Sequence, residues 1–185
     1  NILLTGEING TEKIYSDEEC LDQFADRADR FLIGLSKAVE TEMDDRQVDM
    51  LLQTVPSFER IGDYATNFDE MAQSLADRKL AFSENAQKEL GVLEDAIREI
   101  TDLTIFSFAN SNYNKALQVD PLEEVIDDIC DTMKANHVAR ISRQECTLEN
   151  GFVFNDMITD YERIADHCSN IAVDVLEAVS EVEGM

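Results

Sequence analysis

A nine-residue segment occurs twice in this chain of 185 residues, and the repeat constrains the fold more than any other feature. Residues 59–67 read ERIGDYATN and residues 162–170 read ERIADHCSN, at a separation of 103 residues. The segments EECLD at 18–22 and EEVID at 123–127 precede the two copies and are 105 residues apart. A difference of two residues is an ordinary change in loop length. The chain is therefore predicted to fold as two similar halves.

Little in the sequence would interrupt long helices. It contains two prolines and seven glycines, and apolar residues recur every three or four positions over long stretches. We expect an all-α fold: two tandem three-helix bundles that form an elongated antiparallel helical domain. The predicted helices span about 16–42, 46–75, 83–112, 120–143 and 148–180, and Pro56 is expected to kink or locally break the second of them.

The two halves differ in the number of helices that the pattern predicts, since the first half shows two and the second three. We interpret residues 1–15 as a loop or the remnant of an upstream helix, residues 16–80 as a partial first repeat and residues 83–180 as the second repeat. The missing counterpart of helix 83–112 would lie upstream of residue 1, and the chain starts with Asn1 rather than Met. The sequence thus suggests one compact unit cut from a larger protein.

The charge of the chain argues against several kinds of partner. Its 40 acidic and 15 basic residues give a formal net charge of −25, which opposes binding to nucleic acid and to anionic membrane surfaces. The sequence has no apolar run of about 20 residues, so we expect no direct membrane insertion by this segment. The four cysteines form no CxxC pair, which favours a reducing compartment over a disulfide scaffold. Cations are the partners that the charge favours.

Carboxylates four residues apart lie on one face of a helix, where like charges repel. If neighbouring helices pack antiparallel, each half gathers four of them into a patch that hard cations with oxygen ligands would stabilise. An acidic face exposed to solvent is the commoner reason for such a spacing, but repetition of the whole motif favours metal. The predicted ligands are Glu18, Asp22, Glu59 and Asp63 in the first half, and Glu123, Asp127, Glu162 and Asp166 in the second.

Other polar residues extend these rows. Arg60 and Arg163 follow the glutamates of the repeat, and we expect them to pair with acids of neighbouring helices and to orient the ligands. His167 is expected at an interface or the surface, and His137 in a structural position. Auxiliary ligands are expected one turn beyond the main ones: Asp26, Asp131, Asn67 and Asn170.

Nothing in the sequence indicates catalysis. It has no P-loop, no G-x-S-x-G and no G-x-G-x-x-G motif, and the absence of E-x-x-H argues against a ferritin-like di-iron oxidase. We therefore expect a protein that is not an enzyme. A di-iron enzyme on a helical bundle and a metal-free helical adaptor remain as alternatives.

The segments ERIGDYATN and YERIADHCSNIA resemble the signature of the PhoU family, and the resemblance covers residues 16–180. It is specific, because the signature occurs twice and each copy has its companion E-x-x-x-D motif on the preceding helix. The resemblance implies two three-helix bundles whose motifs bind multinuclear metal clusters. It leaves the metal open among iron, Mn, Mg, Ca and Zn.

One departure from the family affects the expected context. Free-standing PhoU proteins usually carry a segment resembling Q-P-x-A-x-D-L-R ahead of the first signature, where this chain reads DDRQVDMLLQTVPSF. The second signature and the missing helix look more like the PhoU-like tail of bacterial sodium/phosphate cotransporter family proteins.

That likeness implies a metal-binding regulatory domain at the cytoplasmic face of the bacterial inner membrane. It would modulate phosphate transport by contacting a transmembrane transporter portion of the same polypeptide, and a homo-oligomer is compatible with it. The alternative is a free-standing PhoU-type regulator of an ABC phosphate importer and its sensor kinase.

Overall fold

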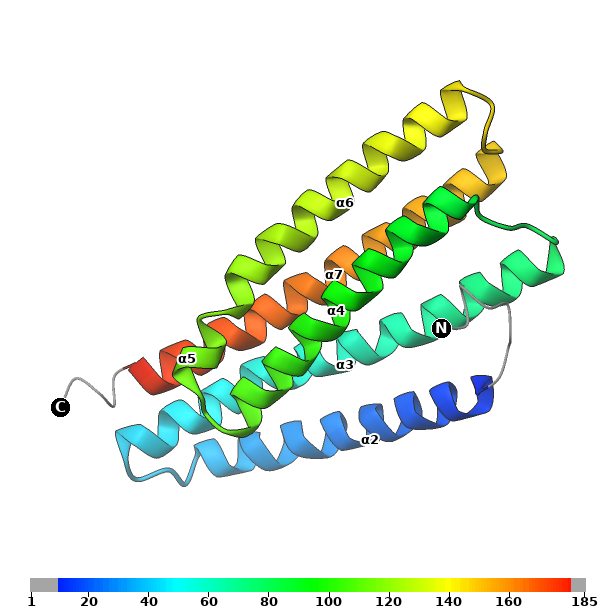
Figure 1. Ribbon diagram of the computed structural model, residues 1–185. Coiled ribbons are helices and arrows are strands. Elements are labelled where there is room, and N and C mark those ends of the chain that lie inside the picture. Colours follow the sequence, from blue (N-terminus) through cyan, green and yellow to red (C-terminus); the bar gives the residue numbers. More distant parts are fainter. Residues whose placement is uncertain (1–9, 181–185) are drawn as a thin grey trace.

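Long helices lie side by side along the axis of an elongated molecule (Figure 1). The computed structural model describes residues 10–180, and every regular element among them is helical, as predicted. The elements are α2 (Thr11–Ser36), α3 (Glu42–Asp77), α4 (Glu84–Ala109), α5 (Tyr113–Ala116), α6 (Val119–Ser142) and α7 (Leu148–Ser180).

The helices form two units that correspond to the two halves of the sequence. The first is a hairpin of α2 and α3, and the second is a bundle in which α4, α6 and α7 pack against one another. α3 and α7, which carry the two copies of the repeated segment, pack together and run in opposite directions (Figure 1). The contact between α3 and α7 therefore joins the halves.

Most of the fully buried apolar side chains belong to the three-helix bundle. Each such side chain contributes about 1.5–3 kcal/mol when it leaves water. In the hairpin, the buried apolar residues are fewer and mostly smaller, as Ala25 and Val48 illustrate. Cys168, predicted to be a core residue, is buried and, like the other three cysteines, free. The fully buried core of the bundle includes Leu90, Leu93, Ile100, Ile126, Cys130, Met157, Ile158, Ala165 and Val175.

The first helix begins and ends earlier than the sequence suggested. Gly10 adopts a left-handed conformation with φ of 113°, and its carbonyl accepts hydrogen bonds from the amides of Lys13 and Ile14 at 3.0 Å. Residues 11–15, predicted as a loop or helix remnant, are therefore helical, and Ser16 lies inside α2. The rest of that prediction, residues 1–9, lies outside the described residues.

Two further boundaries follow from local chemistry. The hydroxyl of Thr41 accepts a hydrogen bond from the amide of Asp44 at 3.2 Å and so caps α3, which therefore begins at Glu42. Pro56 lies within α3, whose helical assignment continues through it without the break that the sequence allowed. Ser83, where the sequence predicted that this helix begins, caps α4 by accepting a hydrogen bond from the amide of Ala86 at 3.3 Å.

Candidate metal centres

Three acidic side chains meet between the two helices of the hairpin. One carboxylate oxygen each from Glu18, Asp22 and Asp63 lies within 4.8 Å of the others. Glu18 and Asp22 come from adjacent turns of α2, and Asp63 reaches them from α3, as the antiparallel packing predicted. We call these three residues the first cluster.

The first cluster holds its charges in an unfavourable arrangement. Partial burial raises the pKa of Glu18, and the charges of Asp22 and Asp63 raise it further. Oδ1 of Asp22 is buried and has no hydrogen-bond partner. One positively charged side chain contacts the cluster: Nη1 of Arg60 lies 3.2 Å from Oδ2 of Asp63. A positive ion placed among these oxygens would offset the repulsion.

The structure does not bring every predicted residue of the first half into this cluster. Glu59 is partly buried on α3 but lies outside the group of three, so its role as a ligand stays a prediction. Asp26 pairs with Arg30 on its own helix, at 2.9 Å between Oδ2 and Nη2. Asn67 donates a hydrogen bond from Nδ2 to Oδ2 of Asp160 at 3.2 Å and thus links α3 to α7.

The second half places its acids between α6 and α7, the counterparts of α2 and α3. Partial burial raises the pKa of Asp127, and the charges of Glu162 and Asp166 add to the rise. The pKa of Glu123 is raised by burial and then by the charges of Asp127 and Asp166. The charges of the other predicted ligands therefore act on both Glu123 and Asp127. We call Glu123, Asp127, Glu162 and Asp166 the second cluster.

The two clusters share a feature that sequence reasoning did not foresee. Oδ1 of Asp127, like Oδ1 of Asp22, is buried without a hydrogen-bond partner. Asp22 and Asp127 are the last residues of EECLD and EEVID and so occupy equivalent positions. Buried carboxylate oxygens normally have partners, and an unpaired one costs free energy. Two unpaired oxygens at equivalent positions indicate that both clusters are suited to bind something positive.

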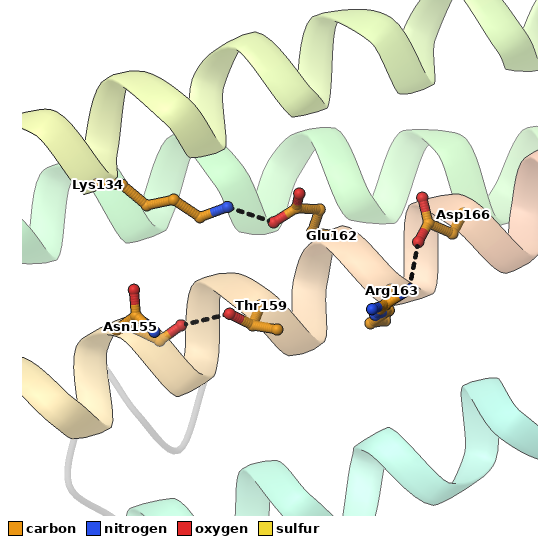
Figure 2. A network of polar contacts seen from close by, with 6 residues as sticks. All are labelled: Lys134, Asn155, Thr159, Glu162, Arg163 and Asp166. Carbon is orange, nitrogen blue, oxygen red and sulfur yellow. Dashed lines mark hydrogen bonds and ion pairs between the residues drawn. The ribbon is translucent and has the colours of Figure 1, made fainter.

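A lysine enters the second cluster that the sequence analysis did not identify. Nζ of Lys134 lies 2.6 Å from Oε2 of Glu162, and the side chain crosses from α6 to α7 (Figure 2). This hydrogen bond raises the pKa of Lys134. The signal was present in the sequence, because Asp127, Asp131 and Lys134 follow one another at i, i+4 and i+7 on one helix face.

The arginines of the repeat contact partners other than those predicted. Nη1 of Arg163 lies 3.4 Å from Oδ2 of Asp166 (Figure 2), and Arg60 makes the same contact with Asp63. Both pairs are within one helix, so the expected pairing with acids of neighbouring helices is wrong. An arginine three residues before an aspartate reaches it along the same helix face. Both arginines nevertheless contact a predicted ligand.

The donor set fits hard metal cations. Carboxylate oxygens are the ligands that Mg²⁺, Mn²⁺ and Ca²⁺ prefer, and the unpaired buried oxygens of Asp22 and Asp127 lack a partner that such an ion would provide. A bound ion would supply positive charge between two helices. His167 lies apart from this role, because its ring packs against Tyr64 with 6.1 Å between ring centroids, at the interface where we expected it.

Comparison with known proteins supports the family resemblance in the second half of the chain. Residues 92–175 match the sequence profile of the family described as PhoU domain, which confirms the resemblance for that segment. The chain is 24% identical over 131 residues to the phosphate-specific transport system accessory protein PhoU homolog 1 of Thermotoga maritima, covering 71% of this chain and 56% of that protein. The PhoU homolog of Streptococcus pneumoniae is 25% identical over 128 residues, covering 69% and 58%. The chain thus spans little more than half the length of these relatives.

Solved structures show the same fold. The crystal structure of PhoU from Pseudomonas aeruginosa superposes with a TM-score of 0.89 at 19% identity, covering 100% of this chain and 87% of that chain. The phosphate transport system regulatory protein PhoU from Streptococcus pneumoniae gives 0.84 at 18% identity, covering 97% and 84%. At these identities the likeness establishes the fold alone.

The comparisons correct the expected context. The relatives are named as accessory proteins of a phosphate-specific transport system, whereas we expected a transmembrane transporter portion on the same polypeptide. The prediction of a transporter portion on the same chain is wrong, and these relatives do not support the assignment to a sodium/phosphate cotransporter. It had relied on one departure from the family pattern and on a missing helix. Separately, the search for membrane-spanning helices between residues 10 and 180 finds none.

Proposed function

We propose, from the premise that residues 92–175 form a PhoU domain, that this chain is an accessory protein that regulates a phosphate transport system through protein contacts. The names of its relatives support this role, since they are accessory proteins of phosphate-specific transport. The resemblance adds an ABC phosphate importer and its sensor kinase as the expected partners. A place at the cytoplasmic face of the membrane stays part of this proposal.

Metal binding is the second part of the proposal, and one observation carries it. Equivalent aspartates of the two repeats, Asp22 and Asp127, each bury an oxygen that has no hydrogen-bond partner. We assign a hard divalent or trivalent cation to each cluster, held by carboxylates from two helices. In the first repeat the ion would join α2 to α3, and in the second α6 to α7. Metal occupancy would thereby determine how firmly each pair of helices is held for contact with partners.

The role in transport can be tested in the organism that carries the gene. Deletion should change the rate of uptake of radiolabelled phosphate, and expression of the wild-type chain in its native length should restore it. The double variant Asp22→Asn/Asp127→Asn should fail to restore it if the metals matter. Asp17→Asn is the matched control, because Asp17 lies on the same helix with 69% of its side chain exposed. Phosphate uptake that is unaffected by deletion would contradict the transport role.

A further inference from the structure

Lys134 makes the two clusters chemically different. We propose that its ammonium group acts as a built-in cation of the second cluster, so that the second cluster binds divalent metal more weakly than the first and must displace Lys134 from Glu162 to fill completely. This inference deepens the metal-binding part of the proposed function and rests on it. It concerns a residue outside the repeated motifs.

The residue equivalent to Lys134 in the first repeat has the opposite charge. Lys134 follows Asp127 by seven residues, and the residue that follows Asp22 by seven is Asp29. Two turns separate the members of each pair, so both place their second residue on the helix face that carries the cluster. The same structural position thus carries an ammonium group in one repeat and a carboxylate in the other.

The contact of Lys134 joins the same two helices that a metal ion would join. Its Nζ lies 2.6 Å from Oε2 of Glu162, and the two side chains are 32% and 31% exposed. Such a charge-assisted hydrogen bond engages an oxygen that a metal would otherwise coordinate. Lys134 therefore competes with a metal for Glu162.

Geometry distinguishes the clusters in the same direction. In the first, three carboxylate oxygens approach within 4.8 Å of one another, and among residues 10–180 the second cluster contains no group of three that approaches as closely. The arginines do not account for the difference, because Arg60 and Arg163 contact Asp63 and Asp166 in the same way. The opposite charges of Lys134 and Asp29, at equivalent positions of the two repeats, therefore remain as the cause of the difference between the clusters.

Calorimetric titration with MnCl₂ tests this inference on the full chain after EDTA treatment and dialysis. Asp22→Asn isolates the second cluster and Asp127→Asn isolates the first. We expect Mn²⁺ to bind the isolated first cluster at least about tenfold more tightly, since one charge at this distance is worth that much or more. Lys134→Gln, added to Asp22→Asn, should raise the affinity of the second cluster by a similar factor.

Introducing a lysine into the first cluster provides an independent test. Asp29→Lys, in the background of Asp127→Asn, should weaken Mn²⁺ binding to the first cluster. Lys115→Gln is the control for loss of a positive charge, because Nζ of Lys115 makes an exposed hydrogen bond to Gln118 on a different part of the molecule. Thermal unfolding in EDTA checks that each variant folds.

The outcomes separate this inference from the function on which it rests. Mn²⁺ bound by both clusters with an affinity that Lys134→Gln leaves unchanged would overturn the role of Lys134 and leave metal binding intact. Failure of every variant and of the wild type to bind Mn²⁺ would overturn both. Stronger binding after Lys134→Gln, with no change after Lys115→Gln, would establish the built-in cation.

Discussion

The rings of Tyr64 and His167 face each other across the contact between α3 and α7, with 6.1 Å between their centroids. Each is the sixth residue of its copy of the repeated segment, so they are equivalent positions of the two repeats. The antiparallel packing of α3 and α7 thus brings equivalent positions of the two repeats together at these rings, and each repeat carries one cluster.

The first prediction concerns metal and stability. MnCl₂ at about one hundred times the dissociation constant should stabilise the protein by about 2.7 kcal/mol per site, or about 5–10 °C in Tm for a domain of this size. Asp63→Asn should abolish the stabilisation that Mn²⁺ provides by binding the first cluster, whereas Asp17→Asn should leave it unchanged. In EDTA, Asp63→Asn should be at least as stable as the wild type, because it removes one repelling charge. Differential scanning calorimetry with and without EDTA measures both effects, and identical curves in Mn²⁺ and EDTA would refute the prediction.

The second prediction concerns the close approach of α7 to α6. A Cβ on Gly151 would lie 2.7 Å from Nε2 of His137 and 3.3 Å from Cδ1 of Ile141, and the buried His137 ring has little room to move. Gly151→Ala should therefore destabilise the protein by about 1–3 kcal/mol in urea denaturation.

Gly91 provides the matched control, since it also lies within a helix and a Cβ there would meet nothing within 4 Å. Gly91→Ala should stabilise the protein by up to about 1 kcal/mol, because alanine favours the helix over glycine. If both substitutions changed the free energy of unfolding in the same direction, the close approach of His137 would not restrict the side chain at position 151.

The third prediction concerns an ion pair inside the three-helix bundle. Nη1 of the buried Arg140 lies 2.7 Å from Oε2 of Glu89, and its guanidinium group lies 5.2 Å from the ring centroid of Phe154. Arg140→Met should cost about 3 kcal/mol, because it leaves the Glu89 side chain, which is 21% exposed, with the hydrogen bond from Asn136 but without its positive partner.

An exposed ion pair provides the comparison. Arg78 contacts Glu149 at 3.3 Å, with more than half of each side chain exposed. Arg78→Met should change the free energy of unfolding by about 0.5 kcal/mol or less. Urea denaturation of both variants measures the difference, and losses of similar size would contradict the importance of burial.

The fourth prediction concerns pH. Burial, with a further contribution from the charge of Glu177, raises the pKa of Asp174 from 3.8 to about 6. The folded protein thus holds this proton more tightly than the unfolded chain, so the carboxyl makes stability fall as the pH rises from about 3.8 to about 6. Above that range, the charged carboxylate disfavours the folded state by a constant amount.

Asp174→Asn tests the assignment. It should raise Tm at pH 7 and have a smaller effect at pH 4.5, because the carboxyl is largely protonated in the folded protein at the lower pH. Thermal unfolding in EDTA at the two pH values gives the comparison. A gain in Tm that is equal at both would show that titration of Asp174 is not responsible.

Helices with a strong apolar period were predictable from the sequence, and those that depend on single turns were not. The last helix was predicted at 148–180 and the structure gives Leu148–Ser180, because its apolar row continues along the whole length. The helical turn Tyr113–Ala116 was missed, since four residues are too few for a period to show. The start of α2 was missed because its N-cap residue is Gly10, which offers no capping side chain that the sequence would reveal.

The candidate site was predictable in outline only. The spacing of Glu18 and Asp22 placed both on one face, and the antiparallel hairpin brought Asp63 to them. Glu59 has the same kind of spacing but lies outside that group. Lys134 was missed because only carboxylates were considered as members of the site, although this lysine lies on the same helix face.

By itself, the sequence determined the helices, their repetition in two halves and the rows of acidic residues along them. All of these are local properties, since the period of a helix sets which residues share a face. Only the tertiary structure decided which acids meet across two helices, which oxygens are left unpaired, and that a lysine lies in one cluster. Those features depend on the distance and rotation between packed helices, and these result from the whole core rather than from any one segment.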